Sequence, residues 1–208
     1  MKIKTLVIGG IVAVCAVGLA LANLSWAPSL RDAQGKKIRK TDKNIAELIP
    51  IDVNGSKQWI SVRGMDRDAP VLLFIHGGPG SPEMTLMREY FGGGLERSFV
   101  VVGWDQRGAA KSFNAAKGTE LTINGTIEDA RAVVDYLRVR FGKEKVFVVG
   151  HSWGTLVGTL LTSKYPDRVA GYCGIGQLVS GLENERISYA WALAQAKQRG
   201  DAKGIKAL

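Results

Sequence analysis

One serine in the chain has a setting that indicates chemistry. Gly150, His151, Ser152, Trp153 and Gly154 form a G-x-S-x-G pattern between an apolar run and an amphipathic stretch. In a sharp turn from strand to helix, small residues two before and two after the serine let the chain bend and expose the hydroxyl. The unpaired N–H groups and the dipole of the following helix favour negative charge there. We therefore predict that Ser152 is a nucleophile.

A glycine-rich turn supplies the groups that such a nucleophile needs. The string His76-Gly77-Gly78-Pro79-Gly80 follows the apolar run 71–75. Glycines at this point let the backbone approach a substrate carbonyl, so that the N–H of Gly78 and that of Trp153 can form an oxyanion hole, with Gly77 as the alternative to Gly78. Each donor of this kind is worth about 3 to 4 kcal/mol in the transition state.

A third motif, Gly-Trp-Asp-Gln-Arg-Gly-Ala-Ala-Lys-Ser at 103–112, follows another apolar run. We expect Asp105 and Arg107 to hold loops in place through charge-assisted hydrogen bonds, and His76 to position the first loop or the substrate. Histidine, cysteine and carboxylate residues do not cluster at the spacing of metal ligands, so the sequence predicts neither a metal site nor a cofactor.

The elements that carry these motifs alternate between strand and helix. Two short runs, 47–53 and 58–63, flank Asn54-Gly55, the commonest dipeptide of a tight hairpin. Continuous apolar runs predict buried strands, and runs with apolar residues at helical spacing predict helices. The predicted helix at 126–141 would turn Glu128, Asp129 and Arg131 away from the core. The predicted strands are 71–75, 99–104, 145–149 and 169–175, and the predicted helices are 82–96, 126–141, 153–164 and 182–199. The fold class is α/β, a mostly parallel sheet with helices on both faces, and the motifs lie at the carboxyl ends of its strands.

Taken in order, HGGPG, DQRGxxxS and GxSWG over residues 45–208 resemble the α/β-hydrolase superfamily and, within it, the proline iminopeptidase-like serine hydrolases. The resemblance implies an acyl-enzyme reaction on a small peptide or an ester, with Ser152 as nucleophile and Trp153 and a glycine of 77–78 as oxyanion donors. It also implies that residues 45–176 form the hydrolase core and that 177–208 begin a helical cap. Ala110 stands where the family usually has glycine.

The resemblance further implies an acid and a histidine downstream of the serine, but no histidine follows Ser152, and the sequence to Leu208 ends before the strands that carry these two residues in the family. The two histidines, His76 and His151, lie in motif turns, and we expect neither to act as general base. Two functions therefore stay open: a serine hydrolase that lacks these partners, and a non-catalytic remnant or membrane-anchored binding module. Glu183 and Glu185 could bind a substrate amine, or they could be solvated charges at a helix start.

The amino-terminal segment indicates export or anchoring. Lys2 and Lys4 precede an uncharged apolar run of 17 residues, Leu6–Ala22. Such a run lies between the length of a cleavable signal and that of a spanning helix, so residues 1–26 are predicted to be a membrane anchor or a signal peptide, with membrane contact through 5–26 if uncleaved. Residues 27–44 read as a basic linker. We expect the body to be extracytoplasmic, although basic residues after the apolar run favour the opposite orientation.

The charge of the chain follows from this segment. The formal net charge is +9, and residues 1–43 hold eight Lys or Arg and two Asp. The body therefore has no basic patch of the kind that binds nucleic acid, and we predict no nucleic-acid partner. Cys15 and Cys173 are expected to be small buried hydrophobic residues. We also expect the strand that ends at Ile175 to expose an apolar edge and to make residues 44–208 poorly soluble alone.

Overall fold

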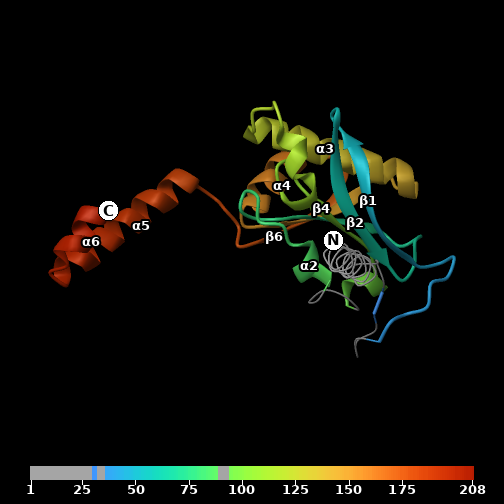
Figure 1. The fold of residues 1–208 in the computed structure, drawn as a ribbon, viewed down its shortest axis with the longest axis horizontal. Helices are drawn as coiled ribbons and strands as arrows, with labels where there is room; N and C mark the ends of the chain where they lie inside the picture. Colours follow the sequence, from blue (N-terminus) through green and yellow to red (C-terminus); the bar gives the residue numbers. More distant parts are fainter. Residues whose placement is uncertain (1–29, 32–35, 89–93) are drawn as a thin grey trace, which may run out of the picture.

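A six-stranded sheet organises the part of the chain that the structure, a computed structural model, describes: residues 30–31, 36–88 and 94–208. Its order is β1-β2-β4-β3-β5-β6 (Figure 1). β1 pairs antiparallel with β2, and β2 with β4, whereas the pairs β4–β3, β3–β5 and β5–β6 are parallel. The strands are β1 Ile45–Val53, β2 Ser56–Gly64, β3 Val71–Ile75, β4 Val100–Asp105, β5 Val146–His151 and β6 Val169–Ile175. The predicted strands are confirmed to within two residues at each end.

The predicted hairpin turn between β1 and β2 is also present. Asn54 and Gly55 have φ angles of 48° and 75°, the positive values that both central residues of a type I′ turn require. The turn matches the twist of the strands, and Val53 pairs with Ser56 directly across it.

Helices cover both faces of the sheet, as the sequence predicts. On one face, α3 and α4 lie together (Figure 1) and pack on the larger core cluster; the opposite face holds a smaller cluster that includes Met87, just after α2. The helices are α2 Met84–Leu86, α3 Ile123–Phe141, α4 Trp153–Lys164, α5 Gly181–Gln198 and α6 Ala202–Ala207, with 3₁₀ turns η2 Leu95–Arg97 and η3 Ala110–Ala116. The helix predicted at 82–96 falls partly on residues 89–93, which lie outside the described part of the chain; its described part is helical from Met84 to residue 88 and forms the 3₁₀ turn η2 at its end.

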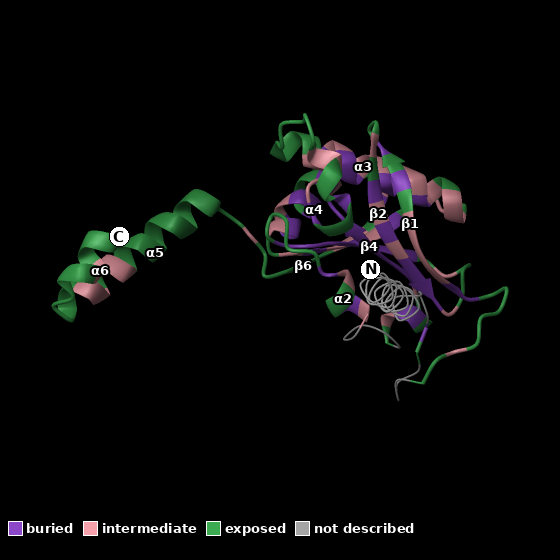
Figure 2. Ribbon diagram, in the orientation of Figure 1, coloured by how far each residue is buried: buried purple, intermediate pink, exposed green. Residues whose placement is uncertain are grey.

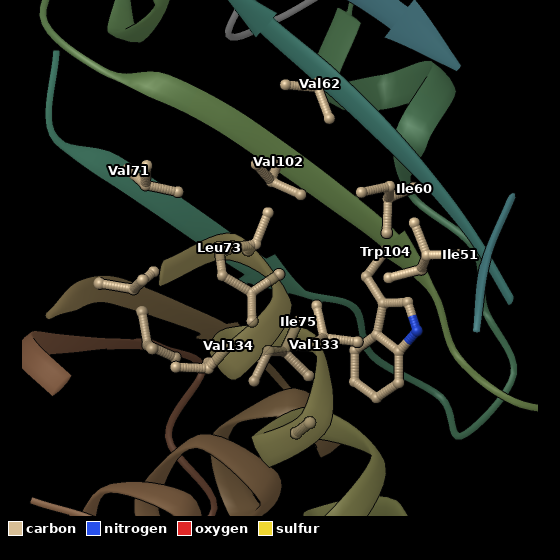
Figure 3. Packing of buried hydrophobic residues seen from close by; sticks show 14 of the residues in the cluster. Ile51, Ile60, Val62, Val71, Leu73, Ile75, Val102, Trp104, Val133 and Val134 are labelled. Atoms are coloured by element: carbon tan, nitrogen blue, oxygen red, sulfur yellow. The ribbon is translucent and has the colours of Figure 1, made fainter. Parts of the chain in front are cut away.

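The larger core cluster shows why α3 docks where it does. Thr122 caps its N-terminus by accepting a hydrogen bond from the N–H of Gly125 at 3.0 Å, and Gly142 ends it in the left-handed conformation. Figure 3 shows Val133 and Val134 of α3 facing Leu73 and Ile75 of β3, and all four side chains are fully buried. The prediction that Asp129 faces away from the core is wrong, because its side chain is buried.

The carboxy-terminal helices stand apart from this core. Figure 1 shows α5 and α6 packed on one another to the side of the body, and Figure 2 colours most of both as exposed. None of the residues of α5 is buried, and Trp191 is 65% exposed. The prediction that 177–208 begin a cap therefore stays a prediction, because these helices are not placed over the sheet.

β6 forms one edge of the described sheet and explains a wrong prediction. Cys173 is exposed rather than buried: α4 packs on the neighbouring Tyr172, and successive side chains of a strand point to opposite faces, so Cys173 lies on the face that α4 does not cover. Ile175 at its end is 44% exposed, in line with the expected apolar edge.

Residues 1–29 lie outside the described part of the chain, and with them the predicted anchor or signal, Cys15 and the first part of the linker. Within the described residues, none of the helices has the length and hydropathy needed to cross a membrane. The described part of the linker makes an isolated antiparallel bridge between Arg31 and Lys37, and Leu30 is buried.

Candidate functional site

Ser152 occupies a sharp bend between β5 and α4. Its φ and ψ are 50° and −116°, a conformation that non-glycine residues rarely adopt, and the residue is exposed. Strained backbone of this kind persists where the surrounding structure fixes it, and it is concentrated at functional sites. The Ser152 hydroxyl makes no hydrogen bond within the part of the chain that the structure describes.

The bend is held from three directions. The Ser152 N–H donates to the carbonyl of Ile175 on β6 at 2.9 Å, and its own carbonyl accepts from the N–H and hydroxyl of Thr155 at 2.8 and 2.6 Å. A Cβ added at Gly154 would overlap the carbonyl of Ile75, and one at Gly150 would overlap the carbonyl of Gly154. Both glycines of the motif are therefore required by close backbone approach.

The glycine-rich turn after β3 lies against this bend. A Cβ added at Gly77 would be 3.2 Å from the Cβ of Ser152 and 3.2 Å from the carbonyl oxygen of His151. Gly78 has a φ of +114°, which favours glycine. Among the described residues, no acceptor takes the backbone N–H of Gly78 or that of Trp153. The structure thus brings Gly77 beside Ser152 and leaves two backbone donors open in the same two turns.

His76 is committed to holding loops together. Its Nε2 accepts the N–H of Gln106 at 3.2 Å, so the proton lies on Nδ1, which donates to the carbonyl of Gly77 at 2.8 Å. The side-chain amide of Gln106 in turn donates to the carbonyl of His76 at 2.9 Å. The ring is buried, and burial lowers its pKa below 6.5, which favours the neutral form. Since both ring nitrogens are engaged, His76 is not placed to take a proton from Ser152.

Asp105 ends β4 and Arg107 lies on the loop that follows, and the two side chains contact different partners. Asp105 is 2% exposed, and one carboxylate oxygen accepts the N–H of Lys111 at 3.1 Å while the other has no partner among the described residues. Burial raises the pKa of this carboxyl. Arg107 instead binds Asp129 of α3, donating from Nε at 2.8 Å and from Nη2 at 3.0 Å. Neither residue forms a described hydrogen bond with Ser152.

Two polar residues near Ser152 were not predicted from the sequence. Glu83, just before α2, is 9% exposed, and its Oε1 lies 2.6 Å from Nδ1 of His151. The same oxygen accepts the N–H of Gly77 over a long 3.4 Å. The available signal was a carboxylate three residues after the glycine turn together with a histidine next to the serine, but only the fold shows that they meet.

Among the described residues, no group of three or more histidine, cysteine, aspartate and glutamate side chains could hold a metal ion. Glu183 of α5 pairs with Arg186 of the same helix at 2.6 Å, an exposed contact of little energetic weight. Glu185 is also exposed on this helix.

The family model described as alpha/beta hydrolase fold matches residues 70–203. The chain is 36% identical over 148 residues to the probable aminopeptidase YbaC of Bacillus subtilis (strain 168), covering 71% of this chain and 46% of that protein. It is 33% identical over 100 residues to the probable proline iminopeptidase of Leptolyngbya boryana, covering 48% and 29%. The crystal structure of epoxide hydrolase VrEH1 from Vigna radiata matches with a TM-score of 0.52 and 27% identity, over 69% of this chain and 46% of that one. The chain spans less than half the length of each of these proteins.

Proposed function

The chain belongs to the α/β-hydrolase fold family, and from that premise we propose that it is the nucleophile-bearing part of a serine hydrolase that acts on a small peptide or an ester. The observation that carries the proposal is the exposed Ser152, held in a strained bend beside Gly77. The aminopeptidase and proline iminopeptidase relatives support a peptide substrate, whereas the epoxide hydrolase neighbour shows that the fold alone does not fix the substrate.

In the proposed reaction, the Ser152 oxygen attacks the carbonyl carbon of the substrate while a general base takes the hydroxyl proton. The carbonyl electrons move onto oxygen, which the N–H groups of Gly78 and Trp153 bind. The tetrahedral intermediate then collapses, the bond to the leaving amine or alcohol breaks, and that group takes the proton. Water hydrolyses the resulting acyl-enzyme by the reverse sequence.

The general base in this proposal is an imidazole outside the 208 residues. Both ring nitrogens of His76 are engaged, and Nδ1 of His151 faces Glu83. Because the relatives are more than twice as long as the matched segment, we propose that sequence beyond this chain supplies the base and the acid that orients it.

The test is covalent labelling of the folded 208-residue chain with a fluorophosphonate, followed by peptide mass analysis. Without an activating base, labelling should be slow, since binding and the oxyanion hole alone retain about 10³ to 10⁴ of rate over water in triad variants. We expect a single adduct on Ser152 that Ser152→Ala abolishes. A folded chain that forms no adduct at Ser152 over hours would contradict the proposal.

The second candidate is a non-catalytic binding module. It is favoured by one observation: within the described residues, neither imidazole bonds to the Ser152 hydroxyl. Peptide binding that is saturable, equal in wild type and Ser152→Ala, and accompanied by no labelling would support it. Turnover that depends on Ser152 would exclude it.

A further inference from the structure

Glu83 joins two turns that are far apart in sequence. Its Oε1 lies 2.6 Å from Nδ1 of His151 at the end of β5 and 3.4 Å from the N–H of Gly77 after β3. The Glu83 side chain is 11% exposed and that of His151 is 43% exposed, so this ion-pair geometry lies at the rim of the site rather than in open solvent. One carboxylate oxygen therefore contacts the glycine-rich turn and the nucleophile turn at once.

Gly77 lies between the Glu83 carboxylate and Ser152. A Cβ added at Gly77 would be 3.4 Å from the Glu83 oxygen and 3.2 Å from the Cβ of Ser152. His151 precedes Ser152 directly, and β6 holds the Ser152 N–H. Moving the carboxylate would thus remove one of the contacts that join the two turns.

We propose that Glu83 is a positioning residue that fixes the distance between the two oxyanion donors, the N–H of Gly78 and that of Trp153, by holding Gly77 and His151 together. The proposal rests on the serine hydrolase function argued above. Misplacement of reacting groups by about 1 Å can cost about a hundredfold in rate, so a clamp of this kind affects chemistry without touching the substrate. Among the described residues, Glu83 makes no hydrogen bond to the Ser152 hydroxyl, which separates this role from that of a base.

The test compares fluorophosphonate labelling of wild type and of folded variants of the full chain. Labelling over a range of probe concentrations gives the maximal rate and, separately, the half-saturating concentration. Glu83→Ala should lower the maximal rate about tenfold or more with the half-saturating concentration unchanged. Glu83→Gln keeps an acceptor oxygen in place and should recover most of that loss. Glu144→Gln, the same chemical change at an exposed carboxylate between α3 and β5, is the matched control and should label like wild type.

His151→Gln tests the same contact from its other side if Glu83→Ala does not fold. The His151 side chain is partly exposed and should tolerate replacement. It should lower the maximal rate about threefold or more, and the double variant should be no slower than Glu83→Ala, since residues that act as a unit are non-additive. The proposal is overturned if folded Glu83→Ala or His151→Gln labels at the wild-type rate, or if Glu83→Gln is as slow as Glu83→Ala.

A measurement without labelling keeps this inference separate from the proposed function. If wild type forms no adduct, the hydrolase proposal fails. NMR then tests by itself whether Glu83 holds Gly77 and His151 together. We expect the Gly77 amide to exchange about tenfold faster in Glu83→Ala and the Nδ1-protonated tautomer of His151 to lose its preference. An unchanged Gly77 amide with an unchanged His151 tautomer would overturn the clamp.

Discussion

Asp129 of α3 holds Arg107 of the loop after β4 through two parallel hydrogen bonds, from Nε at 2.8 Å and Nη2 at 3.0 Å. The same carboxylate accepts the side-chain amides of Asn54 in the hairpin turn and Gln58 in β2, each at 2.8 Å. One buried carboxylate therefore ties together the first hairpin, α3 and the loop that also positions His76. The contact joins segments that no local sequence pattern connects.

Removal of this carboxylate should be costly. Asp129→Ala leaves a mostly buried guanidinium and the buried amide of Gln58 without this acceptor, and breaking one partner of a buried ion pair costs about 3 to 5 kcal/mol. Urea denaturation should show that loss in the free energy of unfolding. Asp167→Ala, which removes an ion pair at a carboxylate 66% exposed, is the control and should change the free energy by less than about 0.5 kcal/mol. Equal effects of the two substitutions would contradict the importance of the buried pair.

His76 should make stability depend on pH. Its folded-state pKa is lowered below 6.5 by burial, so below that pH the unfolded chain binds a proton that the folded chain does not. The free energy of unfolding should therefore fall as the pH drops below 6.5, by at most about 1.4 kcal/mol per pH unit from this group. In His76→Gln, which keeps an acceptor near Gln106, that part of the slope should disappear. Parallel pH profiles of wild type and variant between about pH 7 and 5 would contradict this assignment.

Asp105 should have the opposite kind of effect. Burial raises its pKa, so the folded chain keeps the proton to higher pH than the unfolded chain, and the contribution of Asp105 to stability falls as the pH rises from 3.8 through the raised value. Asp105→Asn keeps an acceptor for the N–H of Lys111 and removes the buried charge. It should raise the Tm at pH 7.5 by a few degrees, as expected of roughly 1 kcal/mol, and the gain should shrink near pH 4. A lower Tm at pH 7.5 would show that the charge is needed.

The sequence predicted the elements of this site better than its contacts. The strands, the hairpin at Asn54-Gly55 and the bend at Ser152 follow from local periodicity and glycine placement, and these were found where expected. Glu83 and His151 are separated by 68 positions, and Gln58 and Asp129 by 71. The order of the strands in the sheet brings such pairs together, and that order cannot be inferred from local sequence patterns.

The wrong predictions have the same physical origin. Asp129 belongs to the polar side of α3 by helical periodicity, yet α3 turns it toward the hairpin, where four donors satisfy it. Cys173 belongs to an apolar strand, but β6 lies at the edge of the described sheet and leaves it exposed. Burial in both cases depends on neighbours from distant segments.

The second glycine of the nucleophile motif can be tested directly. Gly154→Ala places a methyl group where it would overlap the carbonyl oxygen of Ile75, which is backbone inside the sheet and cannot move cheaply. We expect a loss of about 3 kcal/mol or more, at the upper end of overpacking effects. Gly181→Ala, at the start of α5 with nothing within 4 Å of the added methyl, is the control and should be neutral. The Tm of both variants is measured by thermal denaturation. A Gly154→Ala variant with the Tm of wild type would contradict the close approach of the two backbones.

Ser152 itself should trade stability for function. Its φ of 50° and ψ of −116° place a side chain in a region that costs about 1 to 3 kcal/mol and that glycine adopts freely. Ser152→Gly should therefore raise the free energy of unfolding by about 1 kcal/mol, the remainder being lost to the greater freedom of glycine in the unfolded chain. Ser152→Ala keeps the Cβ and the strain, so it should melt close to wild type, while both variants lose fluorophosphonate labelling. Comparison of the two melting curves isolates the backbone strain from the hydroxyl, and a glycine variant no more stable than the alanine variant would mean that the bend stores no strain.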